Sequence, residues 1–252
     1  MPFATNNGVR IRYQVEGQGP PLVMQHGFGD SLQGWYELGY VDALKHTHQL
    51  ILVDARGHGE SDKPHETSAY ANEVLAGDVV AVVRDMGFRR ADYWGFSMGG
   101  RTGFAVARYA PECVRGMILG GAAADGRSRI GDGVRAAIRK AGAEGLVALA
   151  GSGISPQYKA RLLANDTRAL EASRVDSLGF AAVLPTMTMP CLVYAGTKDP
   201  FYPLIEETVA DMPNVTFVKL PDLGHSETNV RSDLVLPHVV AFLGKLATSG
   251  GA

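Results

Sequence analysis

The feature that most constrains the fold is a ten-residue run from Ala91 to Gly100, in which an apolar stretch ends in Gly-Phe-Ser-Met-Gly. The apolar part predicts a buried strand, and the glycine-flanked turn predicts a sharp passage from that strand into a helix. Glycine is needed on both sides because a Cβ there would collide with the neighbouring strand or helix. Such a turn strains its central residue and lifts that side chain above the sheet. Ser97 is therefore a candidate nucleophile.

The same five-residue pattern also occurs in sequences where the serine hydroxyl merely caps the following helix. Catalysis by Ser97 would require a base, a carboxylate that orients the base, and two N–H donors for a developing oxyanion. Whether Ser97 is a nucleophile therefore depends on residues elsewhere in the chain.

Length and composition favour one large α/β domain. The chain has 252 residues, of which 46% are hydrophobic, and these suffice for a full core. A net charge of -2, spread along the chain, indicates neither a nucleic-acid partner nor an anionic membrane surface. Without a leader or membrane-spanning pattern, we expect a cytoplasmic protein. Cys113 and Cys191 lack disulfide or metal-ligand spacing, so we expect two buried thiols and no metal site.

Short apolar runs alternate with helical patterns along most of the chain, as in a doubly wound, mostly parallel sheet. Six runs predict strands buried on both faces: Leu22–Met24, Leu50–Val53, Tyr93–Phe96, Met117–Leu119, Leu192–Tyr194 and Val215–Leu220. Val9–Val15 alternates instead, which predicts an antiparallel hairpin strand at the edge. Between strands, apolar residues from Leu75 to Met86 share one helical face, and Gly87 gives a stop signal.

The segment from Gly121 to Pro190 breaks this alternation, because it has helical patches but no strong strand pattern. It is too long for an ordinary connection. We expect residues 1–120 and 191–252 to form the core, and residues 121–190 to form a short helical cap near the carboxyl edge of the sheet. The alternative is a set of ordinary crossover helices on the flank of the sheet.

Candidates for the base and the acid follow two later strands. His225 comes just after the last apolar run, and Asp199 comes just after Leu192–Ala195. The chain order Ser97, Asp199, His225 is the order of a serine, acid and histidine triad in an α/β-hydrolase. Asp125, which follows Met117–Leu119, is a competing candidate for the acid.

The oxyanion donors are expected at two loops. One donor is the backbone N–H of Met98, directly after the nucleophile. The other is the backbone N–H of Phe28, in a glycine-rich loop that follows the strand Leu22–Met24. His26 begins this loop and is expected to anchor it by hydrogen bonds rather than to act as a base.

Together these motifs resemble the α/β-hydrolase superfamily, in particular small bacterial esterase-like members. The matching segments cover nearly the whole chain outside 121–190: His26–Gly29, Asp54–Ser61, Gly95–Gly100, Gly196–Asp199 and Gly224–His225. The resemblance implies that Asp54, Arg56 and His58 form a structural turn near the rim of the site, with no catalytic or metal-binding role. It also disfavours dehalogenase and epoxide hydrolase chemistry, since both families need a carboxylate at the position of Ser97.

The cap departs from the family pattern, because it is shorter than the lids of many relatives that cleave carbon–carbon bonds. Its aromatic residues are Tyr158 and Phe180. Trp35, Phe201 and Tyr202 lie near the motif loops and are candidates for binding substrate, with plain packing as the alternative.

The sequence thus predicts a cofactor-independent serine hydrolase that cleaves a small ester or lactone through an acyl-enzyme, with a small-molecule substrate and without a nucleic-acid or membrane partner; it does not indicate the oligomeric state. One alternative is a carbon–carbon bond hydrolase that uses the same triad on ring-fission products. Another is a slow-turnover ligand receptor with this fold.

Overall fold

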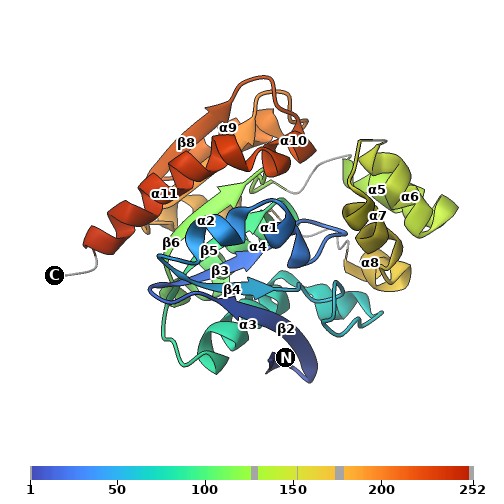
Figure 1. Ribbon diagram of the computed structural model, residues 1–252, viewed down its shortest axis with the longest axis horizontal. Helices are drawn as coiled ribbons and strands as arrows, with labels where there is room; N and C mark the ends of the chain where they lie inside the picture. The colour runs from blue at the N-terminus through green and yellow to red at the C-terminus, as the bar shows by residue number, and fades with distance from the viewer. Residues whose placement is uncertain (1, 126–129, 152, 174–178, 250–252) are drawn as a thin grey trace.

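The computed structural model describes residues 2–125, 130–151, 153–173 and 179–249. Within these residues the strands form one eight-stranded sheet in the order β1-β2-β4-β3-β5-β6-β7-β8 (Figure 1). The strands are β1 (Phe3–Asn6), β2 (Val9–Glu16), β3 (Pro21–Gln25), β4 (Gln49–Val53), β5 (Ala91–Phe96), β6 (Val114–Gly120), β7 (Cys191–Gly196) and β8 (Val215–Leu220). β2 runs antiparallel to β1 and β4, and the remaining pairs are parallel. The predicted mostly parallel α/β fold is confirmed.

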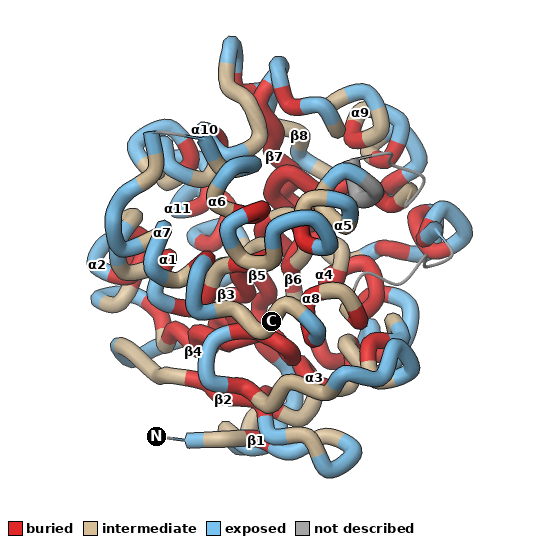
Figure 2. The backbone as a smooth tube through the Cα atoms, turned by 90° about the vertical axis from the view of Figure 1, so that its right-hand side faces the viewer, coloured by how far each residue is buried: buried red, intermediate tan, exposed pale blue. Residues whose placement is uncertain are grey.

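The central strands are apolar throughout because helices cover both faces of the sheet. In β7, Cys191 and Val193 pack into one core layer while Leu192 and Tyr194 pack into the other. The first layer is covered by α3 (Asn72–Asp85), α4 (Met98–Tyr109) and α9 (Tyr202–Ala210). The second is covered by α1 (Gln33–Glu37), α2 (Tyr40–Leu44) and α11 (Ser232–Ser249). Figure 2 shows β3, β5 and β6 as buried tube at the centre of the molecule.

One strand prediction needs correction. Val9–Val15 was expected at the edge, but β2 lies inside the sheet, between β4 and the short β1. The alternation arises because side chains such as Ile11 and Tyr13 are buried against α3, whereas the other face is partly open. Alternation reports one-sided burial and does not identify the edge strand.

Between β6 and β7, helices gather at one end of the sheet, apart from α2, α3 and α11 (Figure 1). They are α5 (Ile130–Ala141), α6 (Ala143–Ala150), α7 (Pro156–Leu163) and α8 (Thr167–Ser173). Their apolar residues Ile138, Leu146, Leu162 and Leu170 form a separate small core. We call α5 to α8 the cap helices.

The chain returns from the cap helices to the main core before β7. Phe180 stacks on Phe104 of α4, and the short 3₁₀ helix η3 (Ala181–Thr186) buries Val183 and Leu184 in the main core. Short segments also connect the other elements: η1 (Thr67–Tyr70), η2 (Pro111–Cys113) and α10 (His225–Val230). In the described part of the chain, none of the helices combines the length and apolar character needed to cross a membrane.

Candidate active site

Ser97 occupies the sharp turn between β5 and α4. Its backbone has φ 52° and ψ -108°, a conformation that side-chain-bearing residues rarely adopt. Its N–H donates to the carbonyl of Gly120 at the end of β6, at 2.7 Å. The turn is therefore held between two neighbouring strands of the sheet, which fixes the direction of the Ser97 side chain.

The glycines around Ser97 allow backbone to pack directly on backbone. A Cβ at Gly95 would lie 2.2 Å from the carbonyl carbon of Gly99. A Cβ at Gly99 would lie 2.2 Å from the carbonyl oxygen of Gln25, at the end of β3. Both separations are far below a van der Waals contact, so the turn requires glycine at these positions.

Replacing Gly99 with alanine is expected to lower the free energy of unfolding by about 3 kcal/mol or more, because the backbone of α4 and that of β3 would have to move apart. Urea unfolding followed by tryptophan fluorescence measures this. Gly244→Ala in α11 is the matched control, since nothing lies within 4 Å of its added Cβ. That variant should be neutral or gain up to about 1 kcal/mol. Equal stability of the two variants would contradict the steric account.

His225 and Asp199 complete a hydrogen-bonded chain with Ser97. The Nε2 atom of His225 lies 2.9 Å from Ser97 Oγ, and its Nδ1 atom lies 2.7 Å from Asp199 Oδ2. His225 begins α10 after β8, and Asp199 follows β7, so three separate strand ends supply the three side chains. With the carboxylate at Nδ1, the proton of neutral His225 lies on Nδ1, and Nε2 can accept the serine proton.

The surroundings of the pair restrict its movement. The Asp199 side chain is fully buried, and its Oδ1 atom accepts a 2.9 Å hydrogen bond from the N–H of Phe201. The His225 ring lies between Phe96 and Phe201, with ring centroids 5.1 Å and 5.2 Å away. His225 remains 25% exposed, so a substrate can reach the Ser97 end of the chain.

Asp125 has a different environment from Asp199. Its backbone carbonyl accepts a 3.2 Å hydrogen bond from Arg101, which also binds the carbonyl of Ala123 at 3.3 Å. Burial lowers the pKa of Arg101, and the charge of Asp125 opposes that shift. Both ring nitrogens of His225 are already bonded to Asp199 and Ser97. Of the two candidate acids, the structure therefore brings Asp199 to the histidine.

The loop after β3 packs against the Ser97 turn. A Cβ added at Gly27 would lie 3.4 Å from the Phe96 ring and 3.5 Å from Ser97 Cβ. Phe28 follows, so its backbone lies beside the turn. Met98 is the first residue of α4, and N–H groups in the first turn of a helix have no intrahelical acceptor. Met98 thus directly follows Ser97, and Gly27, the residue before Phe28, lies against the Ser97 turn; the roles of the two N–H groups as oxyanion donors stay a prediction.

His26 anchors this loop, as expected from the sequence. Its Nε2 atom accepts a 3.1 Å hydrogen bond from the N–H of Ala55, and its Nδ1 atom lies 2.7 Å from the carbonyl of Gly27. With Nε2 as an acceptor, Nδ1 carries the proton and donates to that carbonyl. Both ring nitrogens bind backbone, which leaves His26 no capacity to act as a base.

Asp54 links several loops at the rim of the site. Its fully buried carboxylate accepts hydrogen bonds from the N–H groups of Leu32 at 2.8 Å and Glu60 at 2.9 Å. It also pairs with Arg12 at 3.1 Å. A carboxylate with these partners is fully used in holding backbone together, which agrees with the structural turn implied by the sequence.

Arg56 and His58 in the same turn are also buried. The Arg56 guanidinium binds both oxygens of Asp78 on α3, at 2.9 Å and 2.6 Å. His58 donates to the carbonyl of Arg56 at 3.1 Å, and its Nε2 atom is buried without a hydrogen-bond partner among the described residues. Burial, assisted by the neighbouring His26, lowers the pKa of His58 from 6.5 to about 3.

This pKa shift predicts acid sensitivity of the fold. The folded protein keeps His58 neutral, while the unfolded chain binds a proton below its ordinary pKa of 6.5. The free energy of unfolding therefore keeps its full value above that pH. It falls as the pH drops toward 3, by up to about 1.4 kcal/mol per pH unit. The free energy of unfolding, measured with urea at several pH values, should depend less on pH for His58→Asn than for the wild type. Asparagine is chosen because its side chain keeps an N–H donor for the Arg56 carbonyl. An unchanged slope would contradict the assignment to His58.

Comparison with known proteins identifies the fold family. A family model described as alpha/beta hydrolase fold matches residues 20–134. The enol-lactonase from Burkholderia xenovorans LB400 is 25% identical and has a TM-score of 0.86, and the match covers 96% of this chain and 100% of that one. A hydrolase from Pseudomonas aeruginosa PA01 is 26% identical with a TM-score of 0.84, covering 96% of this chain and 98% of that one. The chain belongs to the α/β-hydrolase superfamily.

Curated relatives of this α/β-hydrolase match a shorter stretch. The bifunctional epoxide hydrolase 2 of Sus scrofa is 34% identical over 110 residues, which are 43% of this chain and 19% of that protein. The chain spans less than half the length of the first curated relatives it matches.

Of the three candidate substrate-binding residues in this α/β-hydrolase, the structure brings Phe201 to His225. Trp35 is 2% exposed and packs on Tyr40 and Trp94 in the core, which agrees with the alternative of plain packing. Tyr202 also lies elsewhere, with its ring on Phe217 and its hydroxyl donating to Glu206. Sequence proximity to a motif loop did not determine where these rings lie.

Sequence reasoning missed the contacts that the cap helices make with the loop after β3, which carries Phe28. The Leu162 side chain of α7 lies 3.2 Å from the position of a Cβ on Gly29, and Leu146 of α6 lies 3.9 Å from it. Phe28 packs on the same apolar cluster, together with Tyr158. No local motif marks these residues, because the contacts join segments more than 100 residues apart.

Proposed function

We propose that this α/β-hydrolase is a serine hydrolase that cleaves a small, uncharged carboxylic ester or lactone through an acyl-enzyme. The observation that carries the proposal is the hydrogen-bonded chain from Ser97 through His225 to Asp199. A hydroxyl on a strained turn, bonded to an imidazole that a buried carboxylate orients, is the arrangement that nucleophilic acyl transfer requires.

Acylation begins when Ser97 Oγ attacks the carbonyl carbon and its proton passes to His225 Nε2. The negative charge that develops on the carbonyl oxygen is stabilised by the backbone N–H groups of Phe28 and Met98. His225, now positively charged, is stabilised by Asp199 and then protonates the leaving alkoxide. The acyl group remains on Ser97 as an ester.

Deacylation repeats these steps with water. His225 Nε2 takes a proton from the water as its oxygen attacks the acyl carbon, and the same N–H groups hold the oxyanion. When the bond to Ser97 Oγ breaks, His225 returns the proton to that oxygen. The carboxylic acid leaves and the enzyme is restored.

The preference for an uncharged substrate rests on the apolar side chains near Ser97. Phe96 and Phe201 flank His225, and Phe28 packs with the apolar cluster of the cap helices. The nearby Arg161 is paired with Asp30 and Glu37. Burying a charged substrate group among these side chains would be costly without a partner. Similarity to an enol-lactonase over nearly the whole chain supports including lactones in the substrate class.

Epoxide opening, the activity named for the Sus scrofa relative, is not proposed for this chain. Attack of Ser97 Oγ on an epoxide carbon would form an ether. Such an ether has no carbonyl carbon for water to attack, so the enzyme would not be regenerated.

The test is an activity screen over esters, thioesters and lactones of graded chain length, with a ring-fission-type carbon–carbon substrate included. The Ser97→Ala protein serves as the blank. Steady turnover of short uncharged esters or lactones supports the proposal. Turnover confined to the carbon–carbon substrate would replace it, and a single stoichiometric burst followed by a stall would indicate a receptor.

A further inference from the structure

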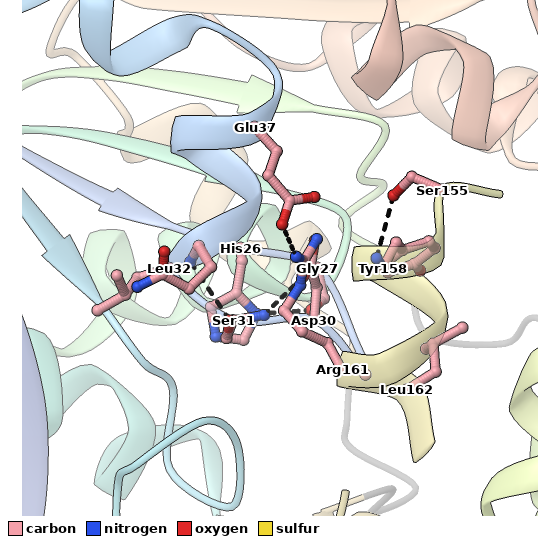
Figure 3. A network of polar contacts seen from close by, with 12 residues as sticks. His26, Gly27, Asp30, Ser31, Leu32, Glu37, Ser155, Tyr158, Arg161 and Leu162 are labelled. Atoms are coloured by element: carbon pink, nitrogen blue, oxygen red, sulfur yellow. Dashed lines mark hydrogen bonds and ion pairs between the residues drawn. The ribbon is translucent and has the colours of Figure 1, made fainter. Parts of the chain in front are cut away.

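Polar contacts join the cap helix α7 to the loop that carries Phe28 (Figure 3). Arg161 Nε on α7 donates to Asp30 Oδ1 at 2.7 Å, and Arg161 Nη1 donates to Glu37 at the end of α1. Just beyond α7, the side-chain amide of Asn165 donates to the carbonyl of Gly29 at 2.7 Å. Three successive positions of the loop, from Phe28 to Asp30, thus contact the cap helices.

The charged part of this contact is shielded from water. The side chains of Arg161 and Asp30 are 16% and 11% exposed, so their attraction is screened less than that of a surface pair. Burial would lower the pKa of Arg161, but its hydrogen bond to Glu37 and the charge of Asp30 outweigh that effect and raise it. The guanidinium also lies over the Tyr158 ring, at 5.5 Å. Arg161 is therefore held firmly and stays charged.

The loop has a second anchor at its start, where His26 holds it to Ala55 of the core at 3.1 Å. Between that anchor and Asp30, two of the three residues are glycine, and Gly29 has φ +78°. Glycine loses more conformational freedom on ordering than other residues do. The position of the Phe28 N–H therefore depends on anchors at both ends of the loop.

We propose that Arg161 and Asn165 are positioning residues, which hold the Phe28 N–H in place as an oxyanion donor through Asp30 and the Gly29 carbonyl. This inference rests on the proposed function, because it gives the cap helices a part in that chemistry. Catalytic competence then requires the cap helices to be docked on the loop. If the cap helices only covered the bound substrate, loss of these contacts would change substrate binding instead.

The test uses Arg161→Gln and Asn165→Ala, with Arg139→Gln as the matched control. Arg139 lies on α5 and pairs with Glu171 of α8 at 2.9 Å, so its loss also removes an ion pair from the cap helices, but one without contact to the loop. Asn165→Ala removes no charge and serves as a second route if Arg161→Gln folds poorly. Thermal unfolding verifies that each variant is folded.

For both test variants we expect kcat to fall on the order of ten- to a hundredfold, less than the loss from deleting an oxyanion donor outright. KM should change by less than about threefold, since the loop acts on the transition state. Affinity for a trifluoromethyl ketone, which forms a tetrahedral oxyanion on the serine, should fall in parallel with kcat. Affinity for the neutral alcohol product should not change. Arg139→Gln should stay within about twofold of the wild type in all four measurements.

Hydrogen exchange gives a readout that does not require activity. Amides of residues 27–32 should exchange faster in Arg161→Gln and Asn165→Ala than in the wild type or in Arg139→Gln. Unchanged exchange, or a rise in KM with unchanged kcat, would overturn the inference. A wild-type protein without hydrolase activity would instead refute the proposed function and the catalytic part of this inference, while faster exchange would still show that α7 holds the loop.

Discussion

Replacing Ser97 with alanine is expected to lower kcat by roughly 10⁴-fold or more, and to leave the protein folded. The substitution removes the Oγ atom that lies 2.9 Å from His225 Nε2, so no acyl-enzyme can form. Residual turnover would come from water activated by His225 beside the oxyanion donors. Because the alanine would keep a Cβ at the same strained turn, we expect little change in stability. Steady-state hydrolysis of a short ester and thermal unfolding measure the two effects.

Ser226→Ala is the matched control for this prediction. Ser226 directly follows His225 but is exposed, so its hydroxyl is not expected to contribute. The control should keep turnover within about twofold of the wild type. Full activity of a purified Ser97→Ala protein would refute the mechanism. A loss of activity that accompanies a large fall in the melting temperature would not count as support.

Replacing Asp199 with asparagine is expected to lower kcat by roughly 10³- to 10⁴-fold near neutral pH. Asp199 Oδ1 accepts the N–H of Phe201, so the amide oxygen of the variant should stay there and its NH₂ group should face His225 Nδ1. That group donates a hydrogen bond, which favours the tautomer with the proton on Nε2. His225 could then no longer accept the proton of Ser97.

Asp125→Asn distinguishes the two candidate acids under the same assay. We expect less than a tenfold loss, because Asp199 and Ser97 already bond both ring nitrogens of His225. A pH profile adds a second criterion: Asp199→Asn should also change the apparent pKa that limits kcat/KM, whereas Asp125→Asn should not. The reverse pattern, with Asp125→Asn inactive and Asp199→Asn active, would assign the acid to Asp125.

Much of the fold could be predicted because the signals are local. The apolar runs from Leu22 to Leu220 correspond to β3 through β8, and the pattern from Leu75 to Met86 corresponds to α3. A strand buried on both faces has to be apolar throughout, so its sequence carries the evidence. The short β1 and the inner place of β2 were missed, since strand order depends on pairing between distant segments.

In the candidate site, too, the features with local sequence signals could be predicted and those that depend on distant segments could not. Sequence by itself determined Ser97, His225 and Asp199 as candidates, because a glycine-flanked turn and polar residues directly after buried strands can be recognised within a few consecutive residues. Their approach to hydrogen-bond distance, and the choice of Asp199 over Asp125, were decided by the parallel sheet that gathers strand ends at one edge.

Only the tertiary structure decided what surrounds the triad. Trp35 packs in the core although it lies near the Phe28 loop in sequence, while Arg161, more than 100 residues away, binds that loop through Asp30. A side chain's partner depends on which surfaces the fold brings together, and no single stretch of sequence records that. The Gly-Phe-Ser-Met-Gly turn is therefore enough to single out Ser97 as a candidate nucleophile, whereas the contacts between α7 and the Phe28 loop could be seen only in the tertiary structure.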